Sequence, residues 1–259
     1  MSVFKQLAIQ VLPRPLLQWG KKHYYTYAVS RFWEAEIEPI KCLIKPGDFT
    51  MDLGANVGWY TALFARLVGE RGKVYSVEPI PDTFVLLSTV VQKLRLNNVE
   101  LFNCAVSDKD GSAAMEIPKH DYGGDNFYMA HIIAGQSYDP ALDRVEVSLH
   151  SLDSLIPEEL ARTVTFIKCD VEGHELAVLK GAAELFKRAR PAMMIEVAGT
   201  AAMQDAPNNE FFSLLRGYGY TPFWFDGKAL RKREKGHWSV NYFFLQPVHL
   251  QQVAHLLVS

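Results

Sequence analysis

Short apolar runs that suit buried strands alternate with amphipathic runs that suit helices, and this alternation constrains the fold of the 259-residue chain most strongly. The expected strands cover residues 49–53, 73–77, 99–106, 164–169, 192–197, 220–225 and 240–245. The expected helices between them cover residues 58–68, 82–94, 173–188 and 208–218. The alternation predicts an α/β fold of Rossmann-like type, with βαβ units, a mostly parallel sheet and helices on both faces. An Asp226-Gly227 turn signal between the last two strands predicts an antiparallel final strand.

The motif DLGANVG at residues 52–58 joins the first expected strand to the first expected helix. Its first glycine removes a side chain where the backbone must bend and a ligand must approach closely, and its second permits tight entry into the helix. Asp52 places a carboxylate at the carboxyl end of a strand, where open α/β sheets bind ligands. Glu78 follows at the end of the next strand, where a carboxylate can accept hydrogen bonds from two ribose hydroxyls.

S-adenosylmethionine suits this set of groups, because it carries an ammonium, a sulfonium and a ribose. A turn with a purely structural role would need glycine, but it would not need acidic residues at two strand ends. A nicotinamide dinucleotide site would show the pattern GxGxxG, which is shaped around a pyrophosphate, whereas this motif has the form DxGxxxG. The residues expected to bind S-adenosylmethionine here are Asp52, Gly54, Asn56, Gly58 and Glu78.

The sequence CAVSD at residues 104–108 ends the third expected strand. In this architecture the position borders the adenine of the cofactor. Asp108 can accept a hydrogen bond from the exocyclic amine, while the backbone of Ala105, Val106 and Ser107 offers polar contacts. The alternative is that Asp108 forms an Asx turn before the following Asp-Gly pair.

The middle of the chain departs from the alternation. Residues 112–117 and 144–149 have the pattern of strands, but residues 118–143 are rich in Gly, Asp, Asn and Tyr. A loop of this length is unusual unless it binds something or is disordered. We expect it to close over the acceptor as a lid. The candidate lid contacts are Tyr122, Asn126, Phe127, Tyr128 and His131.

The N-terminal region, residues 1–46, is expected to form a helical cap on a domain of residues 47–259. Trp33 and the isoleucines after it recur at helical spacing, which predicts one amphipathic helix over residues 21–43. Residues 1–12 predict a short helix packed on the domain, because they are too short and too polar to span a bilayer and lack the order of a secretory signal. A weak contact with a membrane surface is the alternative.

Composition excludes some classes of partner and site. The formal net charge of -2 does not support general nucleic-acid binding, which needs a basic excess. Cys42, Cys104 and Cys169 are widely spaced, and no CxxC or Cys/His cluster suggests a zinc site. We therefore expect a cytoplasmic protein with reduced thiols, without a nucleic-acid partner and without stable membrane insertion. Its oligomeric state is not predicted.

The order and spacing of several motifs resemble FkbM-type methyltransferases, a branch of the class I S-adenosylmethionine-dependent enzymes. The glycine motif alone indicates only the superfamily, whereas IKCDVEGHE with the upstream SLDSL indicates the family. The resemblance covers about residues 47–197 and implies a seven-stranded sheet. It also implies methyl transfer, typically to a hydroxyl oxygen of a natural product or sugar. The matching stretches are MDLGANVGWYT from residue 51, VEP from 77, NCAVSDK from 103, SLDSLI from 151, FIKCDVEGHELAVLKGAA from 166 and MIE from 194.

The candidate catalytic residues lie at the ends of the fourth and fifth expected strands, residues 164–169 and 192–197. A hydroxyl is a poor nucleophile while protonated, so a base at the reacting oxygen helps. Asp170, Glu172 and His174 follow one strand, and Glu196 ends the next. His174 has the pKa best suited to proton transfer near neutrality, although a histidine at a helix start is often merely exposed. Glu175 is the weaker candidate, because a negative charge in the first turn also stabilises a helix.

A metal-dependent mechanism is a further hypothesis. Asp170, Glu172 and Glu196 can converge, and hard divalent cations prefer carboxylate ligands. The resemblance carries no metal to these positions, so we assign no metal ligand. Asp170 is also expected to contact the cofactor, because it lies at the strand end nearest the glycine motif.

Two other functions compete with O-methylation. N- or C-methylation is disfavoured because the chain lacks the Asn/Asp-Pro-Pro-Tyr signature of amide and nucleobase amine methylation. A non-catalytic S-adenosylmethionine-binding module is disfavoured because the acidic and glycine positions of the motif are intact. The basic run at residues 228–235 is expected to be a solvated loop, with contact to an anionic acceptor as the alternative.

Overall fold

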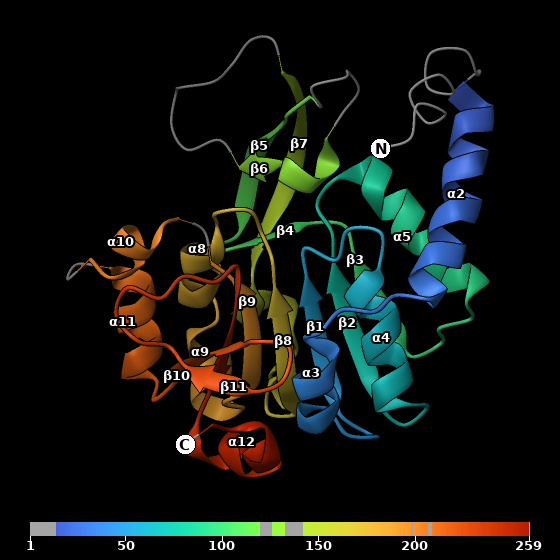
Figure 1. The fold of residues 1–259 in the computed structure, drawn as a ribbon. Helices are drawn as coiled ribbons and strands as arrows, with labels where there is room; N and C mark the ends of the chain where they lie inside the picture. The colour runs from blue at the N-terminus through green and yellow to red at the C-terminus, as the bar shows by residue number, and fades with distance from the viewer. Residues whose placement is uncertain (1–13, 120–125, 133–141, 198, 207–208, 259) are drawn as a thin grey trace.

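Eight strands form the main sheet, in the order β11-β10-β12-β9-β8-β1-β2-β3. Figure 1 shows the computed structural model, which describes residues 14–119, 126–132, 142–197, 199–206 and 209–258. Strands β9, β8, β1, β2 and β3 are parallel, whereas β12 runs antiparallel to both of its neighbours. The strands are β1 (Phe49–Leu53), β2 (Lys73–Val77), β3 (Val99–Phe102), β8 (Val164–Cys169), β9 (Ala192–Glu196), β10 (Thr221–Phe225), β11 (Leu230–Lys232) and β12 (Asn241–Leu245).

The predicted fold class is confirmed, and the sheet carries one strand more than expected. The additional strand is the short β11, which pairs with β10 through the Asp226-Gly227 turn. That turn therefore joins β10 to β11, and the chain then returns so that β12 lies between β9 and β10.

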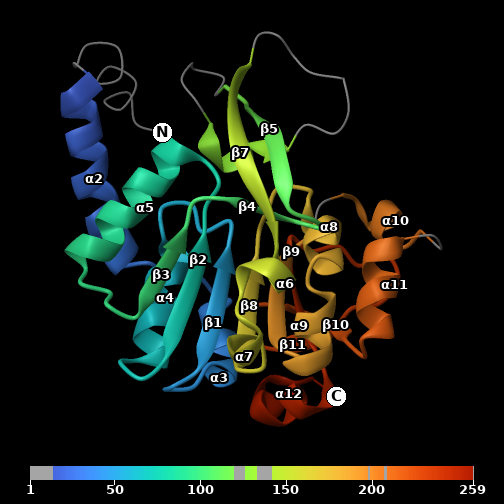
Figure 2. The same cartoon turned by 180° about the vertical axis from the view of Figure 1, so that it is seen from behind.

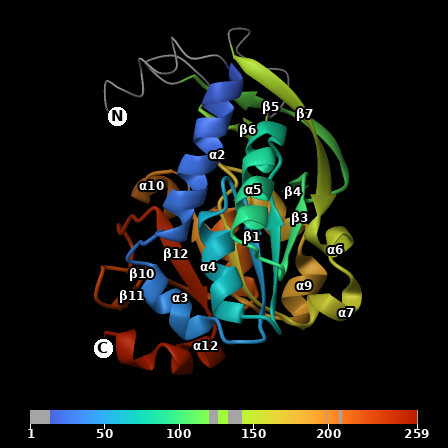
Figure 3. The same ribbon diagram turned by 90° about the vertical axis from the view of Figure 1, so that its right-hand side faces the viewer.

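Helices cover both faces of the main sheet, as Figure 3 shows in an edge-on view with α3 and α4 on one side and α6, α7 and α9 on the other. Side chains alternate along the strands between two cores: Ile167 belongs to the core under α8, α9 and α11, whereas Phe166 belongs to the core under α3, α4 and α12. The helices are α2 (Arg14–Ser30), α3 (Ile37–Leu43), α4 (Trp59–Val68), α5 (Pro81–Lys93), α6 (Leu152–Leu155), α7 (Glu158–Ala161), α8 (Glu175–Lys180), α9 (Ala183–Arg188), α10 (Ala201–Gln204), α11 (Glu210–Gly217) and α12 (Pro247–Gln252).

A second sheet of four strands, which the sequence did not predict, stands over the edge of the main sheet where its parallel strands end (Figures 1 and 2). The single strand expected over residues 99–106 is wrong, because the chain leaves β3 and enters β4 of the other sheet. Asn103 holds this break, since its side-chain amide donates to the carbonyl oxygens of Glu78 at 2.8 Å and Pro79 at 3.0 Å. The strands of the second sheet are β4 (Ala105–Ser107), β5 (Gly111–Ile117), β6 (His131–Ile132) and β7 (Asp143–Ser151), in the order β4-β7-β5-β6.

The SLDSL sequence joins the second sheet to the main domain. The Asp153 carboxylate accepts hydrogen bonds from the backbone N–H groups of Glu184 and Leu185, both at 2.9 Å, and so satisfies the free amides at the start of α9. The backbone N–H of Asp153 also donates to the carbonyl of Gly181 at 3.0 Å. This part of the family motif therefore has a structural role.

The single helix expected over residues 173–188 is wrong, because the structure has two helices there, α8 and α9, which are separated at Gly181. A Cβ on Gly181 would lie 2.0 Å from the carbonyl oxygen of Ser107. This close approach of β4, together with the bond from Asp153, draws the backbone out of a continuous helix.

The single helix expected over residues 21–43 is also wrong. Helix α2 ends at Ser30 and α3 begins at Ile37, and Trp33, which was expected on a buried face, is 75% exposed in the link. Phe32 turns inward instead and packs on Trp59 and Tyr60 at ring distances of 5.3 and 5.1 Å. Residues 1–12 lie outside the described residues. None of the helices in the described part of the chain combines the length and apolar character that crossing a bilayer requires.

Candidate active site

A cavity of about 470 Å³ lies where β1, β2, β8 and β9 end, with the second sheet as its opposite wall. One side is polar and mostly acidic, and the other is apolar. The polar or turn-forming lining residues are Glu34, Asp52, Gly54, Asn56, Tyr60, Glu78, Lys168, Asp170, Glu172, His174 and Glu196. The apolar side includes Ile80, Ala105, Val106, Met115, Phe127, Met129, Ala130 and Ile132.

The turn after β1 folds against β8 as well as toward the cavity. Gly54 has a φ of +77°, and a Cβ built there would lie 1.8 Å from the carbonyl oxygen of Asp170. The glycine is therefore required by the close approach of a neighbouring strand end, a reason the sequence did not reveal. Gly58, which caps α4 with a φ of 96°, would bring a Cβ within 2.8 Å of Leu87.

The Gly54→Ala variant tests this packing. A non-glycine residue in left-handed conformation costs about 1–3 kcal/mol, and the steric clash with the Asp170 carbonyl adds to that cost. We expect a large fall in the midpoint of urea unfolding and loss of cofactor binding, because the strand ends would have to separate. Ala substituted for Gly111, where a Cβ would meet nothing within 4 Å, is the matched control. Equal stability of the Gly54 variant and the parent would contradict this account.

Asp52 is almost fully buried beneath the turn, with 2% of its surface exposed. One carboxylate oxygen accepts a hydrogen bond from the Thr61 hydroxyl at 2.6 Å, and that hydroxyl is also 2.9 Å from the Ser76 hydroxyl. Burial raises the pKa of Asp52 to about 6, and the Thr61 bond only partly opposes this change. Placing a cation beside Asp52 would therefore be favourable.

Glu78 lies at the end of β2, where its two carboxylate oxygens accept backbone hydrogen bonds from Asn56 and Ile80, each at 2.9 Å. Asn56 has a φ of 49°, a left-handed conformation that asparagine tolerates better than most residues. Burial raises the pKa of Glu78 to about 7 despite these two bonds. Each carboxylate oxygen keeps a lone pair with which it can accept a hydroxyl.

Only some of the residues expected to bind the cofactor lie together around the cavity. Asp52, Gly54, Asn56, Glu78, Ala105, Val106 and Asp170 line the cavity. Among the described residues, Gly58, Ser107 and Asp108 do not line it. Ser107 instead lies 2.9 Å from His174, through Oγ and Nε2, and its hydroxyl donates to Asp108 at 3.2 Å.

Three carboxylates converge at the acidic end of the cavity, as the sequence suggested. Asp170, Glu172 and Glu196 can each place an oxygen so that all three lie within 4.8 Å of one another. Burial first, and then the charges of Asp170 and Glu196, raise the pKa of Glu172 to about 7. Burial also raises the pKa of Glu196. Glu172 has a φ of 51°, a strained conformation of the kind that clusters at functional sites.

Lys168 is one of the cavity residues that the sequence reasoning missed. Its ammonium lies 2.8 Å from the Asp170 carboxylate and 5.2 Å from the centre of the Tyr60 ring, and the residue is only 3% exposed. Tyr60 donates in turn to Glu34 at 2.5 Å. A signal for Lys168 was present, because a lysine within an apolar strand shares a face with the residue two positions later, Asp170.

This ammonium already places a positive charge beside the three carboxylates. We therefore expect methyl transfer to survive exhaustive chelation with EDTA, because Lys168 partly fills the electrostatic role of a metal. The measurement is the initial rate before and after chelation, with dialysis against metal-free buffer. A loss of rate that Mg²⁺ restores would support the metal hypothesis and assign Asp170, Glu172 and Glu196 as its ligands.

His174 lies at the start of α8 and lines the cavity. Burial lowers its pKa, so the imidazole is neutral near pH 7 and able to accept a proton. Glu175 is buried and accepts a hydrogen bond from the backbone N–H of Gly173 at 3.0 Å, which fits its alternative role in stabilising the helix start. Among the described residues, Glu175 is not part of the cavity wall.

The expected lid is described only in part. Phe127 and Ile132 contribute to the cavity wall, and the residues between them include a short 3-10 helix, Phe127–Met129. Asn126 and His131 are half-buried, and the His131 Nδ1 lies 3.1 Å from the Met129 carbonyl. Tyr122 and the side chain of Tyr128 lie outside the described residues. Closure over an acceptor stays a prediction.

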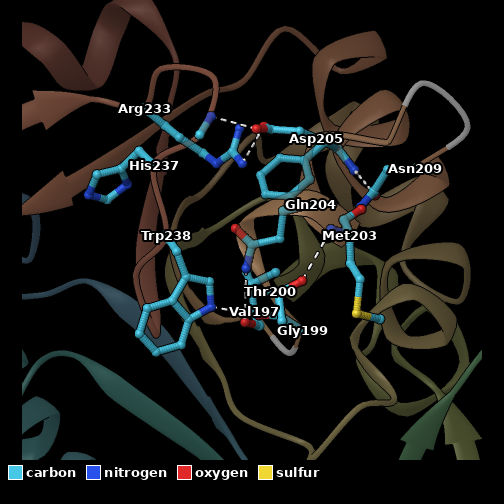
Figure 4. A network of polar contacts seen from close by, with 12 residues as sticks. Val197, Gly199, Thr200, Met203, Gln204, Asp205, Asn209, Arg233, His237 and Trp238 are labelled. Atoms are coloured by element: carbon cyan, nitrogen blue, oxygen red, sulfur yellow. Dashed lines mark hydrogen bonds and ion pairs between the residues drawn. The ribbon is translucent and has the colours of Figure 1, made fainter.

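The basic run at residues 228–235 is solvent-exposed as expected at Lys228, Arg231, Lys232 and Lys235, and Arg233 is the exception. Arg233 has only 9% of its side chain exposed, donates to Asp205 at 2.7 Å and stacks 4.8 Å from the centre of the Phe212 ring. Figure 4 shows this pair together with the Trp238 indole, which donates to the Gly199 carbonyl at 2.5 Å. The segment therefore fastens the chain after β9 to the chain before β12.

Comparisons with known proteins agree with this geometry. A family model of the FkbM methyltransferase domain matches residues 52–222. The curated 31-O-demethyl-FK506 methyltransferase FkbM of Streptomyces tacrolimicus is 28% identical over 201 residues, which cover 69% of this chain and 74% of that protein. A protein-L-isoaspartate O-methyltransferase of Triticum aestivum is 35% identical over 81 residues, 31% of this chain and 32% of that protein.

Solved structures resemble the chain more distantly. Methyltransferase FkbM from Methylobacillus flagellatus KT is 17% identical with a TM-score of 0.49, and the match covers 76% of this chain and 43% of that one. A SAM-dependent methyltransferase from Aquifex aeolicus is 19% identical with a TM-score of 0.44, covering 82% and 88%. The chain thus spans less than half of the Methylobacillus protein.

The family match is the finding that decides the assignment. Residues 52–222 are well over half of the 259-residue chain, and they contain both the glycine turn after β1 and the acidic cluster after β8. The chain belongs to the FkbM methyltransferase domain family of S-adenosylmethionine-dependent methyltransferases.

Proposed function

We propose that the chain transfers a methyl group from S-adenosylmethionine to a hydroxyl oxygen of a small-molecule or glycosidic acceptor. The observation that carries the proposal is that two carboxyl groups line one cavity, Glu78 beside the glycine turn and Glu172 in the acidic cluster. Burial raises the pKa of each of them to about 7. The first suits a ribose and the second suits a proton acceptor near neutral pH.

The residues present fit the cofactor. The buried carboxyl group of Asp52 and the half-buried one of Asp170 favour a ligand with positive charge, and Glu78 has lone pairs left for hydroxyls. The apolar wall of the cavity, formed by Ile80 and Val106 among others, suits a flat ring such as adenine. When bound, S-adenosylmethionine supplies an electrophilic methyl group on a sulfonium that leaves readily.

The protein must then orient the acceptor, exclude water and take one proton. Glu172 and His174 both line the cavity and are both able to accept that proton near pH 7. Lys168 holds the Asp170 carboxylate in position through the ion pair between them. Asp170 then helps to orient the acceptor and contributes negative charge to the cavity. Burial raises the pKa of Glu172 most, and the charges of Asp170 and then Glu196 add to this rise.

The oxygen specificity draws support from the relatives. The Streptomyces tacrolimicus protein is named for a 31-O-demethyl acceptor, and the shorter match from Triticum aestivum is named as an O-methyltransferase. N-methylation stays the alternative, because a base in the cavity would serve an amine as well. A non-catalytic module that binds S-adenosylmethionine is the second alternative.

Two measurements separate these functions. Calorimetric titration tests whether S-adenosylmethionine binds, and incubation with a labelled methyl donor tests transfer to matched sugars that differ by one hydroxyl, amine or blocked O-methyl group. We expect binding, and label on the free hydroxyl sugar alone. Binding without label on any acceptor would favour the non-catalytic module, and label on the amine alone would overturn O-methylation.

A further inference from the structure

The outward face of helix α2 carries several large apolar side chains that are exposed to solvent. Leu16, Trp19 and Tyr27 recur at helical spacing and are 49%, 60% and 59% exposed. The opposite face holds the helix to the domain, since Val29 is buried and Tyr25 packs against a tryptophan of α4. Figure 1 shows α2 at the margin of the molecule, outside α4 and α5. The helix is therefore anchored by one apolar face while a second apolar face meets solvent.

The charge of the chain is unevenly distributed. The first 33 residues contain five basic residues and no Asp or Glu, whereas the rest of the chain holds 22 Lys and Arg against 29 Asp and Glu. The N-terminal segment thus carries +5 and the remainder carries −7, which the net charge of -2 conceals. The five basic residues are Lys5, Arg14, Lys21, Lys22 and Arg31.

Two described cations on or next to α2 are not neutralised by a carboxylate. Lys21 and Arg31 are exposed, and within the described residues neither forms an ion pair with a carboxylate. Arg31 instead lies over the Tyr27 ring at 4.6 Å. Lys93 of α5 adds a further cation beside the helix, with its ammonium 3.4 Å from His23.

We propose that α2 docks the protein on a bilayer surface that contains anionic lipid. Trp and Tyr favour the interface between acyl chains and headgroups, and Lys and Arg reach the lipid phosphates beside them. A helix of 17 residues is about 25 Å long at 1.5 Å per residue, and it would lie flat with its exposed face toward the acyl chains. Charge alone would also attract RNA, but Leu16 and Trp19 form an apolar strip that a bilayer covers better.

Docking would bring the catalytic cavity to the membrane surface. Phe32 and Glu34, which follow α2 within four residues of its end, both line the cavity. The acceptor would then be a hydroxylated compound anchored in or adsorbed to the bilayer, such as a lipid-linked sugar. Only this step rests on the proposed function, because docking itself is measured without substrate.

Flotation with lipid vesicles tests docking of the full chain. We expect it to float with vesicles of phosphatidylcholine and phosphatidylglycerol, to float weakly with phosphatidylcholine alone, and to be released by high salt. Each cation near an anionic surface raises the partition coefficient about fivefold, so Lys21→Gln with Arg31→Gln should lower it about thirtyfold. Trp19→Ala with Tyr27→Ala should lower binding to both kinds of vesicle.

A matched control carries the same kinds of change elsewhere. Val248→Ser with Lys228→Gln alters an exposed apolar residue and an exposed cation on α12 and the β10–β11 turn, and should float like the parent. Circular dichroism confirms that every variant is folded. No flotation of the parent, or flotation that both α2 variants retain, would overturn the proposal. The proposal would also be overturned if the parent did not float but formed a dimer, or bound an RNA oligomer, and the α2 variants abolished that interaction.

Discussion

The Asp52→Asn variant should bind S-adenosylmethionine about 10- to 100-fold more weakly than the parent, because a hydrogen bond to a charged group is worth about 1.5–3 kcal/mol. At the same time, the variant without cofactor should be more stable than the parent at pH 8. Both effects follow from one property, which is that Asp52 holds a carboxylate almost completely out of water. Calorimetric titration measures the first effect, and urea unfolding without cofactor measures the second.

The sign of the stability effect follows from the pKa. Burial raises the pKa of Asp52 from its ordinary 3.8 to about 6, so the folded protein binds this proton more tightly than the unfolded chain does. The stabilisation is complete below the unfolded value and is lost as the pH rises from about 4 through about 6. Above that range the charged carboxylate destabilises the folded protein by about 3 kcal/mol. Replacing the carboxylate by an amide should recover about 1–3 kcal/mol of this at pH 8.

Asp226 provides a control of opposite sign. Hydrogen bonds from the Ala229 backbone and from Arg231 lower its pKa to about 2. The stability it contributes is present above its ordinary pKa and is lost as the pH falls through about 2. Asp226→Asn should therefore lower stability at pH 8 and leave cofactor affinity unchanged. If Asp52→Asn behaved like Asp226→Asn, the buried carboxylate would be structural and its role in cofactor binding would be wrong.

Local sequence patterns were enough to predict most strands of the main sheet. Strand periodicity and the turn motifs are properties of adjacent residues, so β1, β2 and β8 appear at the expected bounds. The errors lie where distant segments meet. The break after β3 depends on Asn103 reaching Glu78, and the break between α8 and α9 depends on Gly181 meeting Ser107. Neither contact has a signature within its own window of sequence.

The same distinction applies to the site. Asp52 and Glu78 were predictable because each follows a recognisable strand, and parallel strands bring their carboxyl ends to one edge. Glu34 and Tyr60 were not, because they enter the cavity from the link after α2 and from the first turn of α4. The second sheet was missed for a related reason: two strands were expected there, but their partners could not be read from alternation.

The Glu172→Gln variant should lower kcat about 10²- to 10⁴-fold if Glu172 removes the acceptor proton, while cofactor affinity stays within a few-fold of the parent. Gln keeps the size of the side chain and its left-handed backbone, but it cannot take up a proton. The matched control is Glu175→Gln, a neighbouring buried glutamate that lies outside the cavity wall and should retain its turnover. Steady-state kinetics on both variants gives kcat, and titration gives the cofactor affinity.

The pH profile distinguishes Glu172 from the other candidate base. A base must be deprotonated, so the rate falls as the pH drops below its pKa. The parent should lose activity below about pH 7 if the base is Glu172, whose pKa burial and the charges of Asp170 and Glu196 raise to about 7. Burial lowers the pKa of His174, so with that base the fall would begin below its ordinary value of 6.5. The Glu196→Gln variant is a second test of which residue is the base. Removing the charge of Glu196 lowers the pKa of Glu172, so the acidic limb moves to lower pH if Glu172 is the base. An acidic limb that stays in place in Glu196→Gln and vanishes in His174→Ala would assign the proton to the histidine instead.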